Sequence, residues 1–132
     1  MPAEQQSWAR VVDASALAAV LFGEPEADAV ADRLGQATLV TSALLRFELA
    51  NICWKKLLRH PERRSALIEA HQLLDQMELC EVEVRFHEVL LLAEREGLTA
   101  YDASYLWLAR ALGLELVTLD EALARAVART RR

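Results

Sequence analysis

Apolar residues along this chain follow two different spacings. In short runs they are consecutive or alternate with polar residues, as in β-strands, and in the longer segments between these runs they recur every three or four residues, as in α-helices. The runs that we expect to be strands are RVVD (10–13), TLVTS (38–42), CEVEV (80–84) and ELVTL (115–119). The segments that we expect to be helices are 14–22, 24–34, 43–58, 62–78, 86–96 and 100–112, with a last helix running through the arginine-rich end.

Glycine and proline support these boundaries. Each of the four glycines directly follows a predicted helix. Pro25 falls in the first turn of helix 24–34, and Pro61 opens helix 62–78. Repeated strand–helix units imply a parallel sheet with helices on both faces, so the fold class is α/β, a three-layer α/β/α sandwich. The length of 132 residues fits one domain, which we place at 10–132 after a short N-terminal tail at 1–9.

Composition excludes several classes of protein. Hydrophobic residues make up 54% of the chain, which excludes a disordered protein, and no apolar run is long enough to span a membrane. The start, MPAEQQSWAR, lacks the basic and apolar regions of a signal peptide, so we expect a cytoplasmic protein. We expect Cys53 and Cys80 to be reduced and buried, and His60, His71 and His87 show no metal-ligand spacing.

Four acidic residues are candidates for chemistry. Asp13 and Asp120 stand at the ends of predicted strands, and Glu48 and Asp102 lie early in helices that leave the same edge of the sheet. Ligands of such sheets bind beyond the carboxyl ends of the strands, so the four side chains can converge there. Helix capping is the alternative, because Asp13 and Asp120 precede helices and Thr99 with Asp102 has the spacing of a capping box.

Glu48 fits the capping alternative poorly. It lies six residues beyond Ser42, and its neighbours at helical offsets, such as Leu45 and Leu49, are apolar. Asn51, one turn later, could donate a hydrogen bond to it, but no Lys or Arg occupies a matching position on this face or on that of Asp102. An ionised carboxylate on an apolar face needs a cationic partner, and metal ions are the natural one.

An all-oxygen ligand set favours Mg²⁺ or Mn²⁺ over zinc, and a pair of such ions can clamp a scissile phosphate. The hydroxyls of Ser15 and Thr118 each lie two residues from one of the aspartates and could orient a carboxylate or a metal-bound water; local capping is an equal alternative for Ser15. We assign Thr118 to the same strand as Asp120, so that both side chains point the same way.

Charge and surface pattern bear on partners. The net charge of −5 is unusual for a nucleic-acid binder, but positive charge is clustered at 55–64 and 121–132. These clusters either contact phosphates or are ordinary solvated faces.

Phe47, Trp54 and Leu58 form a second apolar row on helix 43–58. This row is either covered by helix 62–78 or lines a groove, against helix 24–34, for a helix of another protein.

Other chemistries lack their motifs. The sequence contains no GxxxxGK[ST] or GxGxxG nucleotide-binding loop and no GxSxG nucleophile elbow. The segment Asp13-Ala14-Ser15 lacks the second aspartate of haloacid-dehalogenase-type phosphatases, and the last strand lacks the lysine of a response-regulator receiver.

Three segments together resemble the successive motifs of PIN-domain proteins, most closely the VapC-type toxins: VVDASALAAVLFGEPEA, SALLRFELANICW and LTAYDASYLWLARALGLELVTLD. The resemblance covers about residues 10 to 128. It implies a PIN fold with Asp13, Glu48, Asp102 and Asp120 as the metal-binding acids, and Ser15 and Thr118 as the accompanying hydroxyls. It also implies RNA cleavage with Mg²⁺ or Mn²⁺ that leaves a 5′-phosphate, a homodimer, and a cognate antitoxin. A housekeeping PIN nuclease of RNA processing and a non-catalytic PIN-like binding module remain the alternatives.

Overall fold

A computed structural model describes residues 8–130 of the chain. Most of the predicted tail at 1–9 lies outside these residues, but its last two residues belong to the folded domain. Strand β1 begins at Ala9, and the backbone N–H of Thr38 donates a hydrogen bond to the carbonyl of Trp8 at 2.6 Å. Strand β1 therefore begins one residue before the position that the sequence predicts.

The centre of the molecule is a four-stranded sheet in which every strand pair is parallel, as expected. The strand order is β3 (Leu79–Glu81), β2 (Thr38–Thr41), β1 (Ala9–Val12) and β4 (Leu116–Val117). Val11 lies opposite Val40 on one side and Leu116 on the other, and it is fully buried. Strands β1 and β2 thus lie in the middle of the sheet, with β3 and β4 at its edges.

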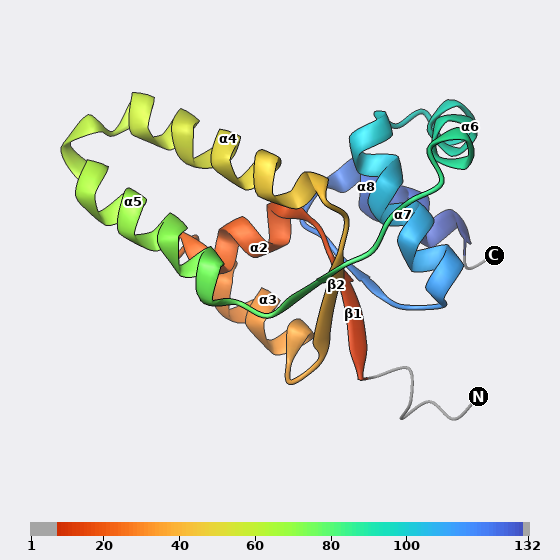
Figure 1. Cartoon of the computed structure of the whole chain (residues 1–132), viewed down its shortest axis with the longest axis horizontal. Helices are drawn as coiled ribbons and strands as arrows, with labels where there is room; N and C mark the ends of the chain where they lie inside the picture. The colour runs from red at the N-terminus through yellow and green to blue at the C-terminus, as the bar shows by residue number, and fades with distance from the viewer. Residues whose placement is uncertain (1–7, 131–132) are drawn as a thin grey trace.

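Helices cover both faces of the sheet, which confirms the three-layer α/β/α architecture. Figure 1 shows α2, α3 and the α4–α5 hairpin on one side, and α6, α7 and α8 on the other. The helices are α2 (Ala14–Leu21), α3 (Ala27–Leu34), α4 (Leu44–Arg59), α5 (Arg64–Gln72), α6 (Phe86–Glu96), α7 (Ala100–Leu112) and α8 (Glu121–Thr130). Two 3₁₀ turns flank α5, at Pro61–Arg63 and Leu73–Gln76.

Several predicted boundaries need correction. Helix 62–78 is interrupted at both ends, so that only Arg64–Gln72 is α-helical. Pro25 precedes α3 instead of entering its first turn, because the chain first makes a turn in which the N–H of Ala27 donates to the carbonyl of Glu24 at 2.9 Å. Strand β4 stops at Val117, so Thr118 does not share a strand with Asp120.

Two glycines explain why the predicted bounds of helices 86–96 and 100–112 are right. Gly97 and Gly113 adopt left-handed conformations with φ of 68° and 66°, and each backbone N–H donates to a carbonyl four residues earlier. Residues with a Cβ atom avoid this conformation, so glycine ends both helices at one position.

The expectation for the cysteines is half wrong. Cys53 is buried on α4, and its thiol lies 3.7 Å from the carbonyl of Leu67 on α5. Cys80 is exposed, because β3 is an edge strand. Both thiols are free.

The second apolar row of α4 faces outward. Phe47, Trp54 and Leu58 are 78%, 53% and 64% exposed, so the alternative in which the following helix covers them is wrong. Helix α5 packs instead beside the Cys53 face of α4. The row is therefore a free surface of the monomer.

Within residues 8–130, none of the helices combines the length and the apolar character required to cross a lipid bilayer.

Candidate active site

The four predicted acids all lie beyond the carboxyl edge of the sheet. Asp13 directly follows β1, Asp120 follows β4, Glu48 lies in the second turn of α4 after β2, and Asp102 lies in the first turn of α7. Burial raises the pKa of Asp13, of Glu48 and of Asp102, and in each case the charge of at least one of the other acids raises it further. The four acids therefore lie at the same edge of the sheet, and these three are each near enough to another acid to be affected by its charge.

Asp13 is the most enclosed of the four, with 3% of its surface exposed. Its carboxylate accepts hydrogen bonds from Ser15 Oγ at 2.8 Å, from Thr118 Oγ1 at 2.5 Å and from the backbone N–H of Ala16 at 3.0 Å. These bonds lower the pKa of Asp13 and partly offset the larger rise caused by burial, to which Asp120 adds. The carboxylate is thus held in one orientation by three donors.

Two hydroxyls connect β1 to the segment after β4. Besides donating to Asp13, Ser15 Oγ accepts from the backbone N–H of Leu119 at 2.9 Å, and Thr118 Oγ1 accepts from that of Asp120 at 3.0 Å. Both hydroxyls thus donate to the carboxylate of Asp13, as the sequence analysis expected, although Thr118 does so from the loop and not from a strand. Segments more than a hundred residues apart meet at one carboxylate.

The capping alternative is also correct for two of the acids. Asp13 is the N-cap of α2, and Asp120 Oδ1 accepts from the N–H of Leu123 at 2.8 Å in the first turn of α8. Thr99 caps α7 by accepting from the N–H of Asp102 at 3.1 Å. Capping and ligand binding are compatible, because a carboxylate has more acceptor positions than one cap requires.

Glu48 has a partner that the sequence analysis did not name. Tyr105 on α7 donates a short hydrogen bond from its hydroxyl to Glu48 Oε1, whereas Asn51, the predicted donor, is exposed. Burial raises the pKa of Glu48, the bond from Tyr105 lowers it, and the charges of Asp102 and Asp13 raise it again. A buried tyrosine hydroxyl needs a polar partner, and this was the signal in the sequence that could have indicated the pair.

The pKa of Asp102 is raised in the same way. Burial is the largest cause, followed by the charges of Asp120 and Asp13, while a hydrogen bond with Thr99 lowers it. Its carboxylate is half-buried at the start of α7, one turn before Tyr105. Helix α7 therefore contributes both an acid and the residue that holds Glu48.

Comparison with known proteins identifies this arrangement. The sequence profile described as "PIN domain" matches residues 10–128. This chain belongs to the PIN-domain family. Ribonuclease VapC3 of Pyrobaculum aerophilum is 35% identical over 119 residues, which cover 86% of this chain and 91% of that protein. The crystal structure of PAE2754 from Pyrobaculum aerophilum aligns with a TM-score of 0.70 and 30% identity, covering 89% of this chain and 78% of that one. The resemblance to VapC-type PIN proteins is confirmed.

The donor set of this PIN domain suits a divalent cation. Among residues 8–130, no Lys, Arg or His forms an ion pair with any of the four acids. In the same part of the chain, no group of three or more His, Cys, Asp or Glu side chains is placed to hold a metal ion as the structure stands. The four acids are nevertheless hard oxygen donors without a counter-charge from residues 8–130, and donors of that kind suit Mg²⁺ or Mn²⁺.

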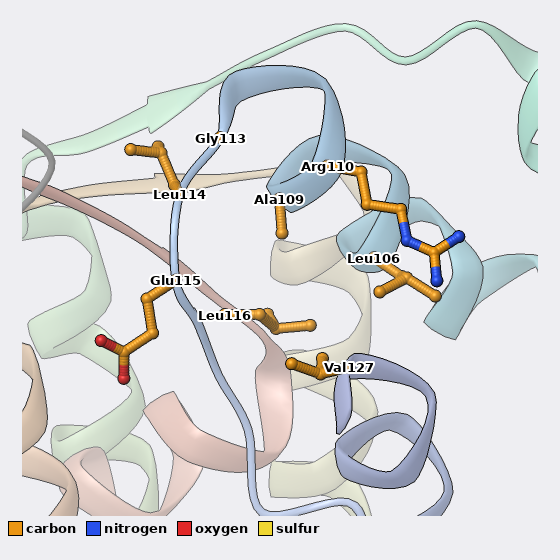
Figure 2. Close-up of a pocket in the computed structure, with 8 residues that line it drawn as sticks. All are labelled: Leu106, Ala109, Arg110, Gly113, Leu114, Glu115, Leu116 and Val127. Carbon is orange, nitrogen blue, oxygen red and sulfur yellow. The ribbon is translucent and has the colours of Figure 1, made fainter. Parts of the chain in front are cut away.

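One pocket of this PIN domain lies away from the acids. It has a volume of about 290 Å³ and is formed by α7, the turn after it, β4 and α8. Figure 2 shows Leu106, Leu116 and Val127 around it, with the carboxylate of Glu115 pointing away. None of the four acids lines this pocket, so the chemistry is assigned to the open edge of the sheet.

Proposed function

We propose that this chain is a metal-dependent endoribonuclease, the toxin of a toxin–antitoxin pair, that hydrolyses RNA phosphodiesters at the Asp13, Glu48, Asp102 and Asp120 edge. One observation carries the proposal: three of these carboxyls have raised pKa values because they are buried beside other acids, and the described part of the chain supplies no cation to them. A cation bound there would relieve the repulsion between these acids. The relative named Ribonuclease VapC3 supports RNA as the substrate.

The four acids would hold Mg²⁺ or Mn²⁺, which when bound stabilises charge that develops on a phosphate under attack by water. Ser15 and Thr118 keep the carboxylate of Asp13 oriented by donating to it from two sides. Asp120 is fixed by capping α8, through Leu123. These contacts are made within the protein itself, so they hold the oxygens in one place, which is the arrangement that electrostatic catalysis favours.

The basic tip of the α4–α5 hairpin is the better of the two candidate RNA contacts. Lys55, Arg59, Arg63 and Arg64 are exposed, and none of them is ion-paired within residues 8–130. By contrast, Arg125 pairs with Glu121 and Arg129 with Glu96 on α8, while Arg131 and Arg132 lie outside the described residues.

Salt dependence tests this assignment. Neutralising the four residues of the tip together should reduce the slope of log affinity against log salt by roughly one unit for each phosphate that is no longer bound. Neutralising Arg125 and Arg129 should leave the slope nearly unchanged. The opposite ranking would move the RNA contact to α8.

Cleavage of RNA in a titration of Mg²⁺ and Mn²⁺ tests the function itself. Asp13→Asn, Glu48→Gln and Asp102→Asn should each abolish cleavage, and Asp120→Asn should impair it. Asp28→Asn on α3 and Glu69→Gln on α5 are matched controls, because both acids are exposed and neither contributes to the raised pKa of Asp13, Glu48 or Asp102. Full activity of the Asp13 or Asp102 variant would refute the site, and metal-independent cleavage would refute the cofactor.

The cleavage assay and the neighbouring genes together separate the alternatives. A non-catalytic binding module would show no cleavage by the wild type with either metal. A housekeeping nuclease would cleave but would lack a short neighbouring reading frame for an antitoxin, and a toxin would be neutralised by that antitoxin. We further propose that the protein acts in the cytoplasm as a homodimer. Dimerisation is measured by sedimentation of the full chain.

A further inference from the structure

Tyr105 has an unusual position for a polar side chain. It is the largest fully buried residue, with 1% of its surface exposed, and it lies on α7 one turn after Asp102. Its ring packs in the core while its hydroxyl reaches Glu48 Oε1 on α4. The core therefore delivers one hydrogen-bond donor to one acid of the candidate active site.

Glu48 needs such a donor. Its carboxylate is at the end of a long side chain with several rotatable bonds, and its acidic neighbours Asp13 and Asp102 repel it. Within residues 8–130 no cation pairs with it, and its only side-chain hydrogen bond there comes from Tyr105. Without this bond, repulsion would favour rotamers that turn the carboxylate toward solvent.

We propose that Tyr105 is a positioning residue that holds Glu48 beside Asp13 and Asp102, so that these carboxylates bind a divalent cation together. The hydrogen bond occupies Oε1 and leaves Oε2 available as a ligand. Because Asp102 and Tyr105 lie on the same helix, α7 fixes the position of its own acid and of Glu48 at once. This inference rests on the proposed function and concerns the same site.

Replacing Tyr105 by phenylalanine tests the proposal, since the variant keeps the ring in the core and removes only the hydroxyl. Binding of Mn²⁺ to the full chain, measured by calorimetry without RNA, should weaken by roughly 10–100-fold, as for other residues that orient metal ligands. When the RNA concentration is varied at limiting Mn²⁺, the apparent kcat should fall while KM for RNA stays the same. Tyr101→Phe is the control, because Tyr101 is exposed on the same helix, whereas the hydrogen bond to Glu48 comes from Tyr105.

The Glu48→Gln background shows whether Tyr105 acts through Glu48. If it does, adding Tyr105→Phe to Glu48→Gln should weaken the residual Mn²⁺ binding no further. An equal loss in both backgrounds, or wild-type affinity of the single variant, would overturn the role of Tyr105 and leave the proposed function intact. Absence of Mn²⁺ binding by the wild type would refute the proposed function and this inference together.

Discussion

The exposed row on α4 gives a prediction whose size follows from the structure. Phe47→Ala should leave the isolated protein almost as stable as the wild type. Phe47 is 78% exposed, so only about 45 Å² of its roughly 200 Å² is buried, which corresponds to about 1 kcal/mol. Alanine recovers about 0.5 kcal/mol of this as a better helix former. The net change is about 0.5 kcal/mol, or roughly 2 °C in the melting temperature of a chain of this length.

Leu49→Ala is the matched control, two residues later on the same helix. Leu49 is fully buried, so this truncation should cost about 2–5 kcal/mol and lower the melting temperature by roughly 7–18 °C. Thermal unfolding followed by circular dichroism measures both variants. Similar losses for Phe47→Ala and Leu49→Ala would show that the row is part of the core and would refute the reasoning.

Binding of the antitoxin is a second measurement on variants of this row. Large apolar residues that are exposed on a monomer are typical anchors of an interface, where truncation of a central residue costs about 2 kcal/mol or more, roughly 30-fold in affinity. Phe47→Ala and Trp54→Ala should therefore weaken antitoxin binding while cleavage of RNA persists. Unchanged antitoxin affinity in both variants would exclude this row as the antitoxin surface.

Three further predictions concern the acids. Asp102→Asn should raise the melting temperature of the metal-free protein because it removes repulsion, whereas a fall measured in EDTA would indicate a mainly structural role. Mn²⁺ at a hundred times its dissociation constant should stabilise the wild type by about 2.7 kcal/mol, and Glu48→Gln should reduce this shift. Metal-free stability should increase as the pH is lowered from 7 toward the raised pKa values of Asp13, Glu48 and Asp102. The folded state binds these protons more tightly than the unfolded state, so this stability is complete below their ordinary values and is lost as pH rises. Urea unfolding between pH 5 and 8 measures the slope, and a flat or inverted profile would contradict the raised values.

The position of the candidate site could be predicted from the sequence because it depends only on the direction of the strands. Once strands and helices alternate, the strands are parallel, and residues after two neighbouring strands must meet at one edge. Asp13 and Asp120 met this condition by position alone. The helix ends at Gly97 and Gly113 were equally predictable, because one residue type dominates the left-handed conformation there.

Other features depend on how helices pack, which a local pattern does not contain. The bond between Tyr105 and Glu48 requires the relative rotation of α4 and α7, whereas the sequence pointed to Asn51 because it lies on the same helix. Likewise, the row of Phe47 and Trp54 has the spacing of a buried face, and only the packing of the helices shows that it is exposed within residues 8–130.

The hydrogen bond from Thr118 to Asp13 also bears on the order in which the protein is synthesised. The two residues are separated by 105 positions, so the ribosome makes Thr118 well after Asp13. A nascent chain that ends before Thr118 has Asp13 without this donor and has no Asp120 at all. Such a chain, still attached to a ribosome and surrounded by RNA, carries an unfinished site. The topology thus delays the proposed activity until the segment after β4 has been synthesised.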